Sequence, residues 1–299
     1  MDKNKKLLAS LGILFCAIVW GSAYFVIKDS LVSLEPMTVV SYRFLIASMP
    51  LLLYIVLTGK NPFRNFKFGL LLGVFLWLVF GPQGIGLKYT SAANTGFINN
   101  TFILFVPFAA YFILKKKITL EPFIAIGISF VGLFFLTGGL KNMNAGDFLV
   151  LFSAVATGTH LVFISRFANK AGLDVLTLSF QQFFTVAMLS LIMHFIFESG
   201  PILTMHIFSK ELIYLGLIAT LGGFVVQLFS QKAISELTTS LVLSTQPVFS
   251  TFFAIFFAGE VLGKSQVAGG ILLVVAPIIY QVIQSRNFRN KIPILADGI

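Results

Sequence analysis

The sequence predicts an all-helical integral membrane protein of ten transmembrane helices, arranged as two inverted five-helix repeats. First, 57% of the 299 residues are hydrophobic, 11% are charged and the mean hydropathy is +0.95, whereas about a quarter of the residues in a soluble domain are charged. Second, apolar segments of about 20 residues, the length that crosses a bilayer, follow one another along the chain. Third, the second half of the chain repeats features of the first.

Each apolar segment ends at polar, glycine or proline residues that are typical of short loops. The predicted spans are 7–27, 36–58, 67–87, 93–114, 119–138, 145–165, 175–197, 211–231, 237–258 and 264–283. We expect residues 7–138 to form the first repeat, residues 145–283 the second, and residues 284–299 a cytoplasmic tail. No connection is long enough for a separate soluble domain.

Lysine and arginine predict the orientation of these spans. With both termini in the cytoplasm, the cytoplasmic segments carry 15 basic residues and the outer segments 5, and Arg43 within a span completes the 21. This bias follows the positive-inside rule. The net charge of +10 is therefore explained by membrane orientation, and we expect a lipid bilayer around the protein and no nucleic-acid partner.

Stretches of the first half recur in the second. Residues 17–21 resemble residues 154–158, and residues 91–107 are echoed 144 positions later. The offset grows from 137 to 144 along the chain, as loops of unequal length allow. Because each half has an odd number of spans, the second half enters the membrane from the opposite side, and the repeats are inverted. Such repeats commonly enclose a substrate site near the midplane.

Two of the repeated spans carry matched polar faces. Gly96 and Asn100 lie about one helical turn apart in the first, and Ser240 and Ser244 do so in the second. An unpaired amide or hydroxyl is costly in hydrocarbon, so these faces should point at protein or at a water-filled cavity. Helix packing is the alternative for glycine and serine. The adjacent amides of Asn99 and Asn100 exceed what packing requires.

Arg43 is a charged residue inside a predicted span, where a charge is expensive and is normally paired or directed inward. It is either a snorkelling side chain that ties the span to a loop or a bidentate anchor for a substrate carboxylate. Its counterpart in the second half is Gln182. An amide there would hydrogen-bond a substrate without steering its charge.

His160 also lies well inside a span. It is either a satisfied packing residue or a proton carrier, because imidazole titrates near neutral pH. The carboxylates fall near predicted helix ends, so a carboxylate proton relay is not expected. Trp20 is the aromatic residue best suited to stack on a substrate, although aromatic residues also fill membrane cores. Gln246, beside Pro247, marks a span that should bend.

These stretches together resemble one known family. Segments 89–107 and 234–260, with residues 20–22 and 42–44, are similar to EamA-type members of the drug/metabolite transporter superfamily. The resemblance covers about residues 7–283. It implies a ten-helix carrier that moves a small organic metabolite, often an amino acid or related compound, across the cytoplasmic (inner) membrane of a bacterium.

The chain departs from the family pattern at one place. The family often has a Gly-Glu pair at the end of the fourth span and of the ninth, whereas this chain has Lys115-Lys116-Lys117 at the first position and Gly259-Glu260 at the second. A role for that carboxylate is therefore supported at Glu260 alone.

We expect a secondary carrier that works by alternating access, with proton coupling left open. The alternative is a flippase for a lipid or a lipid-linked metabolite, whose pocket would open sideways between helices. The candidate substrate-binding residues are Trp20, Arg43, Asn99, Asn100, His160, Gln182, Ser244, Thr245 and Gln246. The sequence has no His-Glu-x-x-His pair and no nucleophile turn, so we expect no enzyme activity, no metal and no cofactor.

Overall fold

The computed structural model describes residues 3–90, 92–139, 144–168, 170, 172–200, 209–258 and 263–291. All regular secondary structure in these residues is helical, which confirms the all-helical prediction. Ser91 and Glu260, both singled out in the sequence, lie outside the described residues, as do residues 292–299 of the predicted tail.

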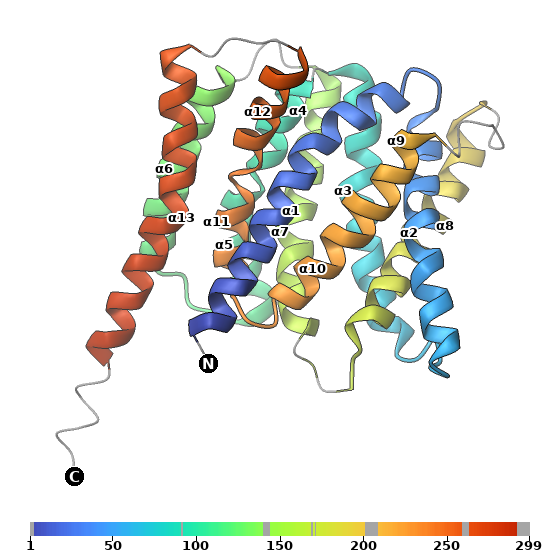
Figure 1. The fold of residues 1–299 in the computed structure, drawn as a ribbon, viewed down its shortest axis with the longest axis horizontal. Coiled ribbons are helices and arrows are strands. Elements are labelled where there is room, and N and C mark those ends of the chain that lie inside the picture. Colours follow the sequence, from blue (N-terminus) through green and yellow to red (C-terminus); the bar gives the residue numbers. More distant parts are fainter. Residues whose placement is uncertain are drawn as a thin grey trace.

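The helices run up and down through one bundle (Figure 1). Those of the first half are α1 (Lys3–Ser30), α2 (Pro36–Leu57), α3 (Phe66–Tyr89), α4 (Ala92–Asn100), α5 (Phe102–Leu114) and α6 (Glu121–Thr137). Those of the second half are α7 (Ala145–Ala168), α8 (Val175–Phe197), α9 (Lys210–Ile213), the π-helix η2 (Tyr214–Gly222), α10 (Gly223–Ser230), α11 (Glu236–Leu243), α12 (Gln246–Ala258) and α13 (Lys264–Lys291).

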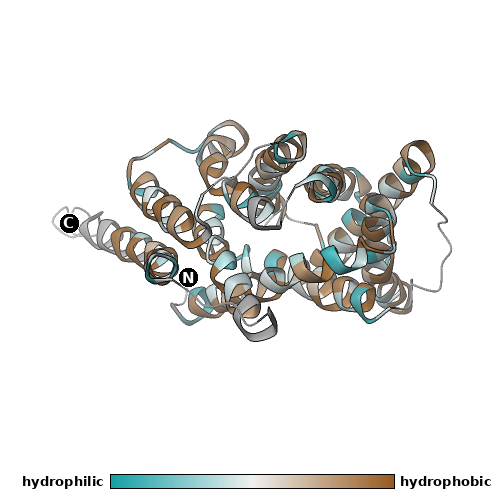
Figure 2. Cartoon of the chain, turned by 90° about the horizontal axis from the view of Figure 1, so that it is seen from above, coloured by the Kyte–Doolittle hydropathy of each residue, from teal (hydrophilic) through white to brown (hydrophobic). Residues whose placement is uncertain are grey.

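Seven helical stretches of the described chain are long and apolar enough to cross a membrane. They include α4 with α5 as one stretch and α9, η2 and α10 as another. Two further apolar helices, Glu121–Leu136 and Lys264–Tyr280, are shorter. Hydrophobic residues predominate along the helices when the bundle is viewed from above (Figure 2), as expected of a surface that faces lipid.

Two predicted spans are interrupted at matching places. The helix over 93–114 breaks at Thr101, whose N–H donates to the carbonyl of Ile98 at 3.0 Å, three residues back rather than four. The helix over 237–258 breaks at Ser244 and Thr245, and Thr245 N–H likewise donates to the carbonyl of Val242 at 3.1 Å. The last helix, in contrast, continues past its predicted end at residue 283 to Lys291.

Polar residues in the loops cap the helices that follow them. The Asp174 carboxylate accepts hydrogen bonds from the N–H of Thr177 at 3.0 Å and from its hydroxyl at 2.9 Å, and so begins α8. Burial raises the pKa of Asp174, but these hydrogen bonds and the nearby Lys60 ammonium outweigh it and hold the pKa below its usual value. Ser235 caps α11 in the same way, through the N–H of Thr238.

Glycines allow neighbouring helices to pack closely. On α3, a Cβ at Gly69 would lie 2.2 Å from the Cβ of Gln181, and one at Gly73 would lie 2.4 Å from the Cβ of Thr185. Helix α8 therefore lies directly against α3 over two turns. Helices α6 and α13 pair along their lengths in a similar way and stand at one edge of the bundle (Figure 1).

Candidate functional site

A buried cavity lies inside the bundle, in contact with helices from both halves of the chain. The space open to the centres of water-sized molecules is about 70 Å³, enough for several waters. It is lined by Trp20, Ala23, Tyr24, Ile27, Arg43, Leu76, Val79, Phe80, Gln83, Asn99, Phe102, Thr157, His160, Leu161, Phe224, Gln227, Leu243 and Gln246. Five of the predicted site residues, Trp20, Arg43, Asn99, His160 and Gln246, are among them.

Arg43 reaches this cavity from α2 with 2% of its surface exposed. Its Nε donates a hydrogen bond of 2.5 Å to the hydroxyl of Thr220, in the π-helix. Its guanidinium carbon lies 4.5 Å from the ring centre of Phe80. Among the described residues no carboxylate lies within 4.0 Å of this guanidinium. A buried cation held by a hydroxyl and an aromatic face retains its capacity to bind an anion.

The same cavity also holds unpaired amide oxygens, which accept hydrogen bonds, whereas the Arg43 guanidinium donates them. The Asn99 Nδ2 donates to the hydroxyl of Tyr24 at 2.8 Å, but its Oδ1 is buried without a partner in the described structure. The Oε1 of Gln227 is in the same state. Gln246 donates through Nε2 to the carbonyl of Trp20 at 3.2 Å. A ligand that donates hydrogen bonds would satisfy both free oxygens.

His160 and Gln182 act as a pair, of which His160 lines the cavity. The His160 Nε2 lies 3.2 Å from the Oε1 of Gln182, and the imidazole lies against the ring of Phe224, with ring centres 6.3 Å apart. Gln182 is fully buried behind it and is not part of the wall. Gln182 can therefore orient the imidazole but does not contact the cavity.

Trp20 links the aromatic wall to the π-helix. Its Nε1 donates to the carbonyl of Ala219 at 2.7 Å, and its ring lies 4.8 Å from that of Phe224. The ring of Phe224 also lies 5.9 Å from that of Phe80. These rings, tilted relative to one another, form an apolar wall beside the polar groups, as is common in sites for small organic ligands.

The remaining predicted residues, Asn100, Ser244 and Thr245, are buried but do not line the cavity. They lie at the helix breaks, where the two hydroxyls donate back to their own helix. Ser244 Oγ bonds to the carbonyl of Leu241 at 2.8 Å, and Thr245 Oγ1 to that of Val242 at 2.7 Å. Hydroxyls engaged in this way stabilise the break rather than a ligand.

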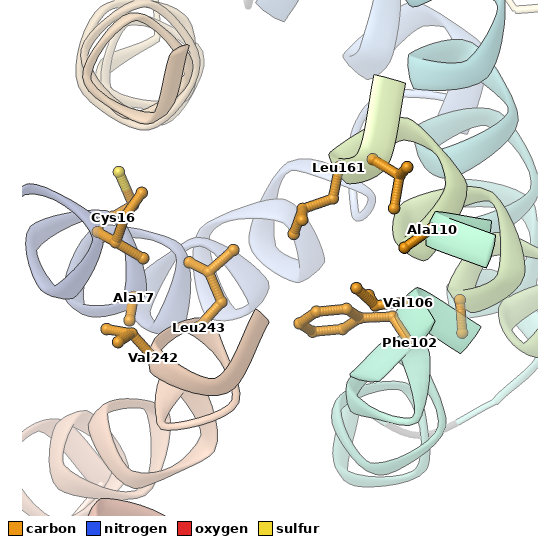
Figure 3. Close-up of a cluster of buried hydrophobic side chains, with 11 residues drawn as sticks. Cys16, Ala17, Phe102, Val106, Ala110, Leu161, Val242 and Leu243 are labelled. Atoms are coloured by element: carbon orange, nitrogen blue, oxygen red, sulfur yellow. The ribbon is translucent and has the colours of Figure 1, made fainter. Parts of the chain in front are cut away.

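One end of the cavity is sealed by a buried apolar cluster (Figure 3). Phe102, Leu161 and Leu243 belong both to this cluster and to the cavity wall. The ring of Phe102, from α5, extends toward the side of the cluster that holds Leu243, from α11 (Figure 3). The cluster continues toward the beginning of α1 through Cys16 and Ile13, so the cavity is closed in that direction.

Tyr24, Gln83 and Gln227 are not among the candidate substrate-binding residues that the sequence predicts. All three line the cavity. A signal for two of them was present, because Gln83 and Gln227 are 144 positions apart, the offset predicted from the sequence for that part of the proposed repeat. Matching amides at matching repeat positions are the pattern expected of a shared site.

An apolar helical bundle that encloses a small cavity with a buried cation and free amide groups is typical of a membrane transporter. The chain belongs to the EamA-like transporter family, whose model matches it twice, over residues 7–138 and 144–280. It is a multi-pass membrane transporter of this type.

Several curated relatives support this assignment. An uncharacterized transporter of Archaeoglobus fulgidus is 30% identical over 278 residues, which are 92% of this chain and 86% of the relative. The S-adenosylmethionine uptake transporter of Rickettsia prowazekii is 23% identical over 264 residues, 86% of this chain and 87% of the relative. A solved crystal structure covers 93% of this chain, and the chain covers 98% of it, with a TM-score of 0.76 at 16% identity. That last likeness establishes the fold.

Proposed function

We propose that this protein is a secondary carrier that moves a small organic metabolite bearing a carboxylate across the bacterial cytoplasmic membrane by alternating access. The observation that carries the proposal is the make-up of the cavity wall. Residues from corresponding positions of the two halves line it together, so the cavity lies where the repeats meet.

The correspondence extends through most of the wall. Most lining residues of the first half have a lining counterpart in the second. The two members of a pair lie 137 positions apart between α1 and α7. They lie 144 positions apart between α3 and α10 and between α4–α5 and α11–α12. The pairs are Trp20 with Thr157, Ala23 with His160, Tyr24 with Leu161, Phe80 with Phe224, Gln83 with Gln227, Asn99 with Leu243 and Phe102 with Gln246. A two-fold relation between the halves explains this pairing, since an unrelated packing would bring together unmatched positions.

Helix packing supports the same relation. Helix α2 packs along α8, and α6 packs along α13. In each pair the two helices occupy the same position in their own half, as a two-fold axis between the halves would require. The helix breaks at Thr101 and at Thr245 also correspond, at an offset of 144. We therefore propose that the two family matches are inverted five-helix repeats, with both termini in the cytoplasm as the basic residues predict.

Arg43 is the residue that we expect to hold the substrate carboxylate, because its guanidinium is buried beside the cavity and has no carboxylate partner among the described residues. The free oxygens of Asn99 and Gln227 would accept hydrogen bonds from an ammonium or amide of the same substrate. This pattern favours an amino acid or a related compound. If transport is proton-coupled, His160 is the group in the cavity that would carry the proton.

A lipid flippase is less well supported. The described chain does have an apolar groove between α12 and α13, lined by residues such as Val248, Phe252 and Ile271. This groove shares no lining residue with the central cavity. A lipid mover needs a sideways opening into its polar site, whereas here the apolar and polar spaces are separate.

The test of the proposal is uptake into proteoliposomes of a panel of amino acids, other carboxylates and matched analogues that lack the carboxylate. We expect transport of a carboxylate compound. The Arg43→Gln variant should lose about 1.5–3 kcal/mol of substrate binding, or about ten- to hundredfold in affinity, and Arg43→Lys should retain part of it. The control is Arg64→Gln, at an exposed loop position. Transport that is unchanged in Arg43→Gln at equal protein level would contradict the assignment.

A further inference from the structure

The central cavity continues into a narrow neck between α1, α2 and α3. The neck shares Tyr24, Ile27, Arg43, Phe80 and Gln83 with the cavity wall. It is completed by Leu31, Pro36, Val39, Val40, Gly84 and Leu87. About 20 Å³ of it is open to the centres of water-sized molecules, which is little more than one water requires.

Gly84 keeps this neck open. A Cβ built on Gly84 would lie 3.5 Å from the Cβ of Pro36 and 3.7 Å from a methyl group of Val40. These are ordinary van der Waals distances, so alanine fits here without displacing its neighbours. A larger side chain would fill the neck.

Beyond the neck lies a wider mouth at the end of the bundle where α1 ends and α2 begins. The mouth shares Leu31 and Pro36 with the neck, and about 300 Å³ of it is open to water-sized molecules. It contains the ion pair of Lys88 and Glu35, whose nitrogen and oxygen lie 2.7 Å apart. Cavity, neck and mouth therefore lie one after another, each sharing lining residues with the next.

The corresponding positions of the second half form a closed apolar cluster instead. Ile27, Leu31, Pro36, Val39 and Gly84 correspond by the repeat offsets to Ile164, Ala168, Val175, Leu178 and Leu228. All five of these counterparts belong to one buried cluster between α7, α8 and α10, together with Leu72 and Phe167. Where the neck has the hydrogen of a glycine, the cluster has the side chain of Leu228, which is 1% exposed.

We infer that the neck is the access route to the cavity in this state. The cluster around Leu228 occupies the corresponding position of the second half and is the second access route, which Leu228 closes here. The inference rests on the proposed function, because only a carrier needs two such routes. It assigns one residue to each gate. Gly84 leaves the first open, and Leu228 plugs the second.

The experiment measures access rather than transport, so its outcome does not depend on the substrate. A Cys16→Ala, Ala23→Cys background removes the native thiol and places one thiol on the cavity wall. The probe is the membrane-impermeant anion sulfonatoethyl methanethiosulfonate, applied to either face of proteoliposomes of known orientation. Labelling is read by mass spectrometry.

We expect slow labelling from the face that bears the mouth, because the neck holds about one water at rest and must widen before the larger reagent reaches Ala23→Cys. Gly84→Leu should abolish it, and Gly84→Ala, which fits the neck, should slow it. The matched control, Gly127→Leu, lies on an exposed face of α6 with nothing within 4 Å and should leave labelling unchanged. Leu228→Ala should admit the reagent from the opposite face.

Labelling that Gly84→Leu leaves unchanged would overturn the route, even if the protein transports as proposed. Conversely, the route stands if labelling responds as expected while no carboxylate compound is transported, and the proposed function then fails alone. If Leu228→Ala folds and gives no labelling from the opposite face, the assignment of the second gate is wrong.

Discussion

Asn99 and Asn100 are adjacent in sequence but lie in different surroundings. Successive residues of a helix point about 100° apart, so only one of the two amides faces the cavity. Asn99 lines it and bonds to Tyr24, whereas Asn100 is buried beside the break at Thr101. The difference separates a cavity-lining amide from one outside the cavity wall within one turn of α4.

Replacing these two residues in turn tests that distinction. Asn99→Ala removes the amide from the cavity, so we expect the apparent affinity for the transported compound to fall by about two- to tenfold, the value of one hydrogen bond. Asn100→Ala should leave the affinity within about twofold. The measurement is the concentration dependence of uptake at equal protein level. A larger loss of affinity in Asn100→Ala than in Asn99→Ala would reverse the assignment.

Part of the cavity wall was predictable from residue type. A guanidinium, an imidazole and an indole each carry polar N–H groups that need a hydrogen-bond partner inside an apolar span. Arg43, His160 and Trp20 were predicted as site residues, and they do line the cavity. Ser244 and Thr245 were predicted from the polar face that recurs in both halves, and they do not line the cavity, because a hydroxyl can bond to its own helix. Sequence alone does not distinguish these two outcomes.

At the scale of elements, the positions of the helices were predictable from the sequence, but the change from α-helix to π-helix was not. Apolar length and loop residues place the spans, and α8 begins and ends where the sequence predicts. Nothing in residues 211–231 predicts the π-helix Tyr214–Gly222. It is held by partners distant in sequence, such as Trp20, which donates to the carbonyl of Ala219.

The contact of α3 with α8 gives a prediction about stability. An alanine Cβ at Gly73 would lie 2.4 Å from the Cβ of Thr185 and 3.0 Å from the carbonyl oxygen of Gln182, so the helices must separate. We expect Gly73→Ala to lower the free energy of unfolding by about 1–3 kcal/mol. Thermal unfolding in detergent would measure it.

Gly127→Ala is the matched control for that experiment, because both variants gain the same helix propensity and a Cβ at Gly127 meets nothing within 4 Å. The difference between the two midpoints therefore reports packing alone. Equal midpoints for Gly73→Ala and Gly127→Ala would show that α3 and α8 are not in close contact.

At the scale of the whole molecule, the two ends of the bundle differ although the family model matches each half. One end holds the mouth with the half-exposed pair of Lys88 and Glu35. The other is closed by apolar clusters and by the pair of Lys116 and Glu236, in which the glutamate side chain is 2% exposed. A duplicated fold with one open and one closed end is what a carrier at rest in one state would have.

The measurement that tests this account most directly is thiol accessibility at two corresponding positions, in a Cys16→Ala background. Val40 lines the neck, and Ser179, 139 positions later, is fully buried and follows Leu178 of the closed cluster in sequence. Without substrate, Val40→Cys should react with an impermeant thiol reagent from one face, and Ser179→Cys should not react. During transport, reactivity should fall at Val40→Cys and appear at Ser179→Cys from the opposite face. Reaction of both variants from the same face, or no reciprocal change, would contradict the account.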